Sequence, residues 1–225
     1  MQFRDRREAG MLLAKELSDL GDRQDVLVLG IPRGGVVVAY EVARSLRAPL
    51  DVYIARKLGA PHNPELALGA VTSDGTQVLD HELVARLGVP NSYVLEETER
   101  QRLEIQRRLA AYRGPRPGAE VKNRVVVLID DGVATGATVQ ASLRALRQRQ
   151  PAQLILAVPV GPADTLQQLS REVDRLACLY APELFWAVGA FYATFDQTQD
   201  AEVIQLLQGP DAAMRNPAGK GEQEP

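Results

Sequence analysis

The stretch VVVLIDDGVATGAT, residues 125–138, decides how the rest of this chain is interpreted. Five apolar residues run directly into two adjacent carboxylates, Asp130 and Asp131, and a loop made almost wholly of Gly, Ala and Thr follows. A short, continuously apolar run that ends in turn residues is typical of a strand buried on both faces. The small residues after it allow the backbone to approach a ligand closely. The stretch therefore predicts a buried strand whose end carries chemistry.

Strand and helix patterns alternate along most of the chain. The predicted strands are residues 25–29, 50–57, 66–71, 76–79, 125–129, 154–160 and 176–180, and residues 58–65 are predicted as a loop. The predicted helices are residues 3–20, 36–46, 138–149 and 164–173. This alternation favours an α/β fold with a largely parallel sheet and helices on both faces. In such sheets, ligands bind beyond the carboxyl ends of the strands.

A long helical stretch, residues 81–113 with a break near Gly88–Pro90, interrupts this alternation. The spacings Glu96–Arg100 and Glu104–Arg108 predict ion pairs on a solvated face. A narrow apolar stripe is expected from Val94, Leu95, Leu103, Leu109 and Tyr112. The stretch could serve as a hood, as a dimer surface or as a solvated decoration. We expect residues 1–208 to form one domain with this insertion, and the polar, Gly/Pro-rich residues 209–225 to be disordered.

Composition narrows the classes of function. The 225 residues carry a net charge of −3, which argues against a dedicated nucleic-acid-binding protein. The single cysteine, Cys178, follows an apolar segment and is expected to be a buried structural thiol in a reducing compartment. No apolar run approaches the roughly 18 residues of a membrane span, and the first residues lack the apolar core of a signal peptide. We expect a soluble cytoplasmic protein without a membrane partner.

The loop DDGVATGAT has the residue types of a phosphate site. Backbone amides at the start of the following helix favour an anion, and Thr135 and Thr138 add hydroxyls. Asp130 and Asp131 would repel a phosphate unless they bind something else, such as sugar hydroxyls or a Mg²⁺-bound water. The loop is thus interpreted as a cradle for ribose 5-phosphate. The alternative is an ordinary helix N-cap, with Asp131 or Thr135 capping and Asp130 exposed.

The same stretch resembles the phosphoribosyl-diphosphate (PRPP) signature of the type I phosphoribosyltransferases. That signature has apolar residues, two acids and a short loop that ends in TGxT, and the resemblance extends over about residues 25–195. It implies a parallel sheet with a smaller hood over the active site. It also implies that Asp130 and Asp131 bind the ribose hydroxyls. The residues that would surround the 5-phosphate are Ala134, Thr135, Gly136, Ala137 and Thr138.

Two other segments resemble parts of this family. The loop GIPRGG is similar to the pyrophosphate loop, which implies pyrophosphate binding by Pro32, Arg33, Gly34 and Gly35; a tight strand–helix turn is the alternative. The segment ARKLGAPHNPE resembles the lead into the mobile catalytic loop, which implies that Arg56 and Lys57 meet the pyrophosphate. A solvated pair of cations is the alternative for these two residues.

The resemblance also implies Mg²⁺ as cofactor. His62, His81 and Cys178 lie too far apart in the sequence to indicate a metal site built from protein alone. We expect Mg²⁺ to be held mainly by the phosphates of the substrate, with Asp130 and Asp131 as candidate additional ligands. Both histidines are expected to be exposed.

The implied activity is an enzymatic transfer of 5-phosphoribosyl from PRPP to a nitrogen acceptor, a nucleobase, with release of pyrophosphate. Ala134 stands where the hypoxanthine–guanine members carry an acid, which disfavours that subclass. The segment FWAVG resembles the base-stacking segment of those enzymes and makes Trp186 and Val188 candidate base-binding residues, with a buried core aromatic as the alternative for Trp186. A homodimer is a further expectation. The alternative function is a non-catalytic regulator that senses PRPP or a nucleotide.

Overall fold

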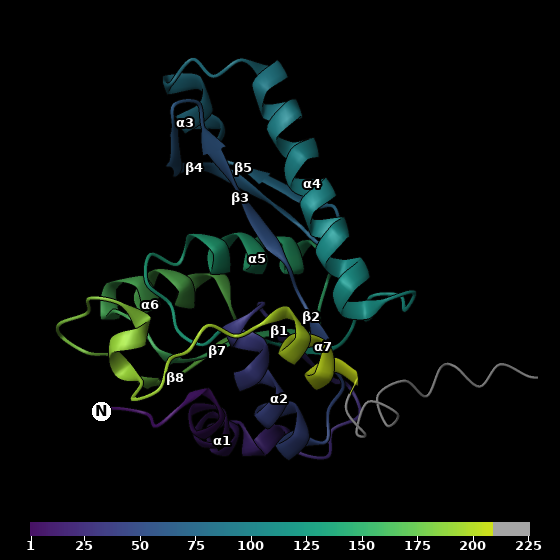
Figure 1. Cartoon of the computed structure of the whole chain (residues 1–225), viewed down its shortest axis with the longest axis vertical. Helices are drawn as coiled ribbons and strands as arrows, with labels where there is room; N and C mark the ends of the chain where they lie inside the picture. The colour runs from purple at the N-terminus through teal and green to yellow at the C-terminus, as the bar shows by residue number, and fades with distance from the viewer. Residues whose placement is uncertain (209–225) are drawn as a thin grey trace, which may run out of the picture.

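The computed structural model describes residues 1–208, and its core is a five-stranded parallel sheet with the order β2-β1-β6-β7-β8 (Figure 1). The strands are β1 (Val26–Gly30), β2 (Leu50–Val52), β6 (Val125–Ile129), β7 (Gln153–Val160) and β8 (Arg175–Tyr180). In the centre, β1 and β6 pair in parallel with Val28 opposite Val127. The α/β fold class predicted from the sequence is confirmed.

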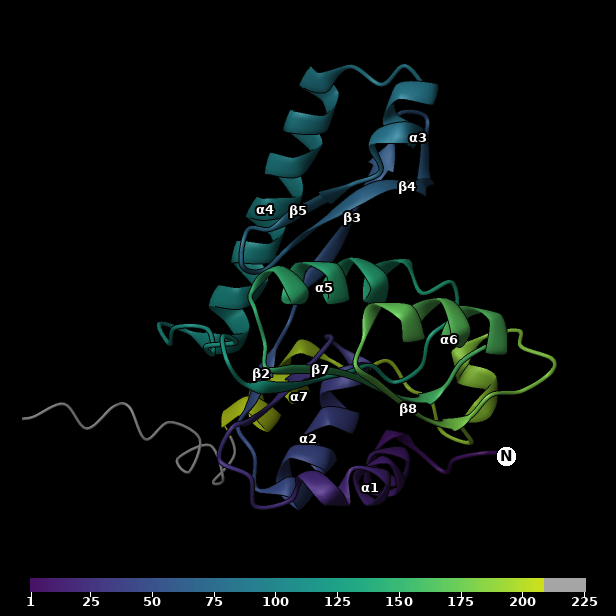
Figure 2. The same ribbon diagram turned by 180° about the vertical axis from the view of Figure 1, so that it is seen from behind.

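Helices cover both faces of this sheet. The helices α1 (Arg6–Glu16), α2 (Gly34–Leu46) and α7 (Asp200–Gln208) lie on one face, and α5 (Ala137–Gln148) and α6 (Ala163–Leu169) lie on the other (Figures 1 and 2). Successive strand residues point to opposite faces. Accordingly Val125, Val127 and Ile129 pack in the apolar cluster of α1 and α2, while Val126 and Leu128 pack in the cluster of α5.

A smaller unit stands beyond α5, in the upper part of Figures 1 and 2. It contains an antiparallel sheet of β3 (Ala55–Ala60), β4 (Asn63–Thr72) and β5 (Gln77–Leu79), with α3 (His81–Arg86) and α4 (Asn91–Arg113) beside it. The carboxyl end of α4 is attached to the main sheet. The Arg113 Nε donates to the Asp51 Oδ1 at 2.7 Å, and the Tyr112 hydroxyl donates to the Asp200 Oδ1 at 2.7 Å.

The prediction of a loop over residues 58–65 is wrong, because β3 and β4 continue through most of it and turn only around Pro61 and His62. The register of the two strands shifts at Gly59. A Cβ at that glycine would lie 2.8 Å from the Pro64 Cα, so a residue without a side chain lets the strands approach there. Glycine and proline therefore belong to an irregular hairpin here, although the sequence pattern suggested a loop.

The helical stretch of residues 81–113 is confirmed, with its break at residues 87–90. Within α4 the Glu104–Arg108 pair forms at 2.8 Å. The predicted partner of Arg100 is wrong, since Arg100 pairs with Glu97, whose side chain is buried. The predicted apolar stripe is partly wrong: Val94 and Tyr112 are buried and Leu109 is partly buried, but Leu95 and Leu103 are exposed. The helix α7 and its nine residues were not predicted at all.

Several smaller expectations can be compared with the structure. His62 and His81 are exposed, as expected, whereas Cys178 is half-buried and not fully buried. Partial burial raises the pKa of its thiol. The predicted disorder of residues 209–225 lies outside the described residues. Between residues 1 and 208, no helix combines the length and the apolar character that a membrane crossing needs.

Candidate functional site

Two loops meet where β1 and β6 end. These strands are parallel neighbours, so their carboxyl ends share one edge, and the Ile31 N–H donates to the Ile129 carbonyl at 2.9 Å. A Cβ on Gly34 would lie 1.9 Å from the Asp131 Oδ2, and a Cβ on Gly35 would lie 2.8 Å from the Asp130 Cα. The loop of residues 32–35 therefore lies directly on the two carboxylates, and only glycine fits at these two positions.

The two acids differ in their surroundings. The Asp131 N–H donates to the Asp130 Oδ1 at 2.9 Å. Burial, reinforced by the negative charge of Asp131, raises the pKa of Asp130 well above its ordinary value. A carboxyl in this position favours a proton, a cation or a hydroxyl donor. The alternative interpretation of a simple N-cap is wrong, because the N-cap of α5 is Gly136 at φ 75° and Asp130 is partly buried.

Arg6, at the start of α1, joins this site although no sequence pattern indicated it. Its Nε donates to the Asp131 Oδ2 at 2.7 Å, and its Nη1 donates to the Asp196 carbonyl at 2.7 Å. The guanidinium lies 3.8 Å from the centre of the Phe195 ring, a cation–π contact. The Tyr192 hydroxyl donates to the Asp131 carbonyl at 2.5 Å. The sequence separation of 125 residues between Arg6 and Asp131 hides this contact from any local pattern.

The loop before α5 presents its backbone to solvent. Ala134, Thr135, Ala137 and Thr138 are exposed, and only Gly136 is buried. The Thr165 hydroxyl of α6 donates to the Ala134 carbonyl at 2.9 Å and so connects the loop to α6. Within residues 1–208, no side chain caps the start of α5 or the start of α2. No side chain therefore competes for the first-turn amides of α5, whereas at α2 the Val36 N–H already donates to the Arg33 carbonyl at 3.2 Å.

The structure places the predicted cations Arg33 and Arg56 differently. The Arg33 Nη1 lies 3.9 Å from the Asp200 Oδ1. The chain enters β3 from the carboxyl edge of the main sheet, since the Tyr53 N–H donates to the Gly30 carbonyl at 3.0 Å. The Arg56 Nε donates to the Gln101 Oε1 of α4 at 2.8 Å.

Lys57 follows Arg56 on β3. Adjacent strand residues point to opposite faces, so Lys57 lies on the face of the hairpin turned away from α4. The structure thus brings the Arg33 loop onto the two acids, whereas it turns Arg56 toward α4. That Arg56 and Lys57 contact pyrophosphate stays a prediction.

The candidate base-binding segment lies against the acidic loop. A Cβ on Gly132 would lie 2.5 Å from the Val188 Cγ1, so Val188 packs beside the residues that follow Asp131. The Trp186 side chain is 86% exposed, and Leu184 is 74% exposed. The alternative of a buried core aromatic at Trp186 is therefore wrong. An exposed indole, two residues before Val188 in the sequence, can stack on a flat ligand.

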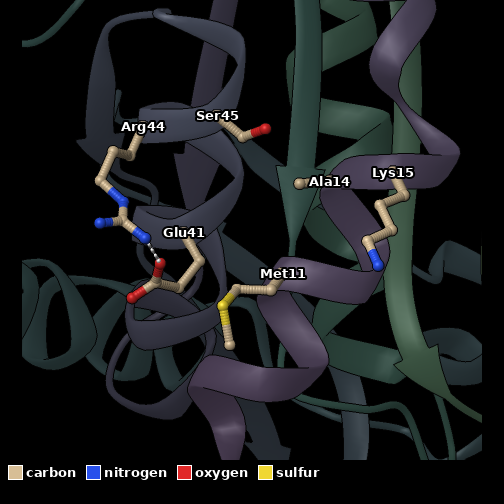
Figure 3. A pocket seen from close by; sticks show the side chains of 6 residues that line it. All are labelled: Met11, Ala14, Lys15, Glu41, Arg44 and Ser45. Atoms are coloured by element: carbon tan, nitrogen blue, oxygen red, sulfur yellow. Dashed lines mark hydrogen bonds and ion pairs between the residues drawn. The ribbon is translucent and has the colours of Figure 1, made fainter.

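Two hollows on the described part of the chain differ in their relation to the site. One of about 380 Å³ lies between α1 and α2 and is lined by Met11, Ala14, Lys15, Glu41, Arg44 and Ser45 (Figure 3). There the Arg44 Nη2 donates to the Glu41 Oε2 at 2.7 Å, and neither loop of the site contributes a residue. The other, of about 240 Å³, borders the site through Arg6 and α7. Among residues 1–208, no group of three or more His, Cys, Asp or Glu side chains could hold a metal.

Residues 5–193 match the family model of the phosphoribosyl transferase domain. The chain belongs to this family. Over 219 residues it is 43% identical to proteins of two Mycobacterium tuberculosis strains, "Putative phosphoribosyl transferase MT0597" in CDC 1551 / Oshkosh and "Putative phosphoribosyl transferase Rv0571c" in H37Rv. The match covers 97% of this chain but 48% of each relative, so the chain spans about half their length.

The crystal structure of the protein TT1426 from Thermus thermophilus is similar along nearly the whole chain. It shares 45% identity and a TM-score of 0.82, covering 92% of this chain and 98% of that one. The resemblance to the phosphoribosyltransferases expected from the sequence is confirmed by the family match.

Proposed function

We propose that this chain transfers a 5-phosphoribosyl group from PRPP to a nitrogen atom of a small acceptor, a nucleobase, in a Mg²⁺-dependent reaction. The observation that carries the proposal is the convergence of two uncapped helix starts, those of α2 and α5, on either side of Asp130 and Asp131. Each helix start favours an anion, and the acids favour hydroxyls. A sugar diol between a monophosphate and a diphosphate has this arrangement, and PRPP is such a molecule.

Each group of residues then has a role. The amides of residues 134–138, with the Thr135 and Thr138 hydroxyls, bind the 5-phosphate. Asp130 and Asp131 accept hydrogen bonds from the ribose hydroxyls, while the loop of residues 32–35 binds the pyrophosphate. These assignments are supported by the exposure of residues 134, 135, 137 and 138 and by the contact of Gly34 and Gly35 with the acids.

The reaction exchanges one bond at the anomeric carbon. The bond from that carbon to the pyrophosphate oxygen breaks, the pyrophosphate leaves with the electron pair, and the acceptor nitrogen forms the new bond and loses its proton. The carboxylates of Asp130 and Asp131 stabilise positive charge that develops on the ribose ring, and Arg33 stabilises the departing negative charge. Arg33 must leave Asp200 to do so, because it is paired there at 3.9 Å.

The side chains present fit a metal held largely by substrate. Asp130 is a partly buried carboxyl next to a second acid. A cation, or water bound to it, would reduce the repulsion between the two negative charges. Mg²⁺ prefers phosphate and water ligands, so a substrate with a diphosphate would supply most of them. When bound, Mg²⁺ neutralises charge on the pyrophosphate. Asp130 is the protein group that we assign to contact it.

The acceptor would enter beside Trp186 and Val188. The exposed indole supports stacking on a flat ring, and Val188 adds apolar contact next to the acidic loop. A cytoplasmic location is part of the proposal and is supported by the lone thiol of Cys178, which suits a reducing compartment.

The test is calorimetric titration of PRPP with Mg²⁺, followed on the same sample by a screen for pyrophosphate release with purines, pyrimidines and other nitrogen acceptors. The proposal expects binding and release with one class of acceptor. The double variant Asp130→Asn, Asp131→Asn serves as the control and should bind PRPP at least about tenfold more weakly, since each charged hydrogen bond is worth roughly 1.5–3 kcal/mol. Binding without release for any acceptor would favour the sensing role, and absence of binding would refute the proposal.

A further inference from the structure

The side chain of Arg6, at the start of α1, is held by several partners at once. Its side chain and that of Asp131 are 12% and 16% exposed. The guanidinium contacts a carboxylate, a backbone carbonyl and an aromatic face at once. The segment that supplies Phe195 and Asp196 is itself fixed to the chain beside Arg6, because the Thr194 N–H donates to the Arg4 carbonyl at 2.9 Å. Arg6 is therefore a rigid element of this structure.

Arg6 holds one oxygen of the Asp131 carboxylate in place. Arg6 engages the Oδ2 of Asp131, and a Cβ on Gly34 would lie 2.7 Å from the Arg6 Nε as well as 1.9 Å from that Oδ2. Arg6, Gly34 and Asp131 thus pack together from α1, the start of α2 and the loop after β6. With Oδ2 held by Arg6, rotation of the Asp131 carboxylate is restricted.

The charge of Arg6 has a second effect. Two carboxylates lie between two loops that are built for phosphates, and their charges would oppose an anionic ligand. The guanidinium compensates Asp131 at 2.7 Å within a site that is mostly shielded from water. The pair of acids can then accept hydrogen bonds from a sugar without repelling the phosphates on either side.

We propose that Arg6 is a positioning residue that holds the Asp131 carboxylate in place for a ribose hydroxyl. The inference rests on the proposed function, and it assigns to the first turn of α1 a part in substrate recognition. Arg6 acts through Asp131, the carboxylate to which its Nε donates. Loss of Arg6 should therefore weaken ligands that contain the ribose more than ligands that lack it.

The experiment compares two fragments of the substrate. Binding of ribose 5-phosphate and of pyrophosphate, each with Mg²⁺, is measured by calorimetry for the parent chain and for the Arg6→Lys, Arg6→Gln and Arg4→Gln variants. Lysine keeps the charge but cannot reproduce the planar set of donors. Arg4 is the matched control, because its side chain is 65% exposed and its pair with Asp5 is at the surface.

The inference expects Arg6→Gln to weaken ribose 5-phosphate by about 10- to 100-fold, as loss of a charged hydrogen bond predicts. Arg6→Lys should weaken it by less, and Arg4→Gln by no more than about twofold. Pyrophosphate binding should weaken less than ribose 5-phosphate binding in Arg6→Gln, because pyrophosphate has no ribose hydroxyl to bind Asp131; loss of the Arg6 charge next to Gly34 leaves only a general electrostatic effect on pyrophosphate.

Equal weakening of both ligands would show that Arg6 only supports the fold, and unchanged binding of both would show that it has no part in recognition; either result overturns the inference. If Arg6→Gln does not fold, Arg6→Lys decides by the same comparison. A parent chain that binds neither fragment would refute the proposed function together with the inference. A parent that binds both, with unchanged variants, would refute the inference alone.

Discussion

The substitution Gly34→Ala tests the central contact of the site with a single methyl group. In the structure the added Cβ would lie 1.9 Å from the Asp131 Oδ2, whereas carbon and oxygen need roughly 3.3 Å. The carboxylate must therefore retreat by more than about 1 Å. That movement takes Oδ2 beyond hydrogen-bond range of the Arg6 Nε, which now lies at 2.7 Å.

The size of the effect follows from the bond that is lost. A hydrogen bond between charged partners contributes roughly 1.5–3 kcal/mol, and the low exposure of both side chains keeps water from replacing it. A loss of that size lowers the melting temperature of a chain of this length by roughly 3–12 °C. It should also weaken PRPP binding by about 10- to 150-fold, because Asp131 no longer points at the ribose.

The assays are a thermal melt without ligand and a calorimetric titration with PRPP and Mg²⁺. Gly21→Ala is the control, since Gly21 has φ −59° and its Cβ would meet only the Ser18 carbonyl at 3.2 Å. We expect that control to keep the parent affinity and to melt within a few degrees of the parent. A Gly34→Ala protein that matches Gly21→Ala in both assays would refute the reasoning, because the loop would then not lie on Asp131.

Three further substitutions address other parts of the site. Asp130→Asn should raise the melting temperature of the ligand-free chain at pH 8, and each kcal/mol gained corresponds to about 2–4 °C in a chain of this length. Because the pKa of Asp130 is raised in the folded chain, the stability of the parent falls as the pH rises above the ordinary value of 3.8. The gain in melting temperature from Asp130→Asn should therefore shrink toward pH 4. An equal gain at pH 4 and pH 8 would contradict this. Lys57→Ala should lower turnover by at least about tenfold with little change in melting temperature. The control Lys122→Ala, at an exposed position, should lower neither. Normal kinetics of Lys57→Ala would remove Lys57 from the site. Trp186→Ala should leave the melting temperature unchanged because the side chain is exposed, and should raise the KM for the acceptor by about three- to tenfold, an indole stacking contribution; a KM change for PRPP alone would argue against stacking on the acceptor.

The meeting of the two loops could be predicted from the sequence. Apolar runs at residues 25–29 and 125–129 indicated buried strands of a parallel sheet, and parallel strands bring their carboxyl ends to one edge. That the two strands are direct neighbours is seen only in the structure. Small residues at both strand ends then indicated a ligand. These features are local in the sequence, so a residue pattern is sufficient to show them.

Other parts of the site depend on contacts that no local pattern records. Arg6 reaches Asp131 across 125 residues, and its own surroundings in the sequence are those of an ordinary charged helix start. The sequence prediction divided the hairpin of residues 55–72 wrongly, because Gly59 and Pro64 suggest a loop when they are considered alone. Their effect depends on the opposite strand, which a single segment does not reveal. The exposure of Trp186 likewise depends on which neighbours fail to cover it.

Asp200 connects three parts of the molecule that are distant in the chain. It lies 3.9 Å from Arg33 of the loop of residues 32–35 and accepts a hydrogen bond from Tyr112 at the end of α4. Burial, with the nearby Asp200 carboxylate, raises the pKa of Tyr112 to about 12, so the phenol stays a donor at neutral pH. A ligand that draws Arg33 away leaves Asp200 with Tyr112. A single side chain, Asp200, thus connects the end of the long helix α4 with the loop that carries Arg33.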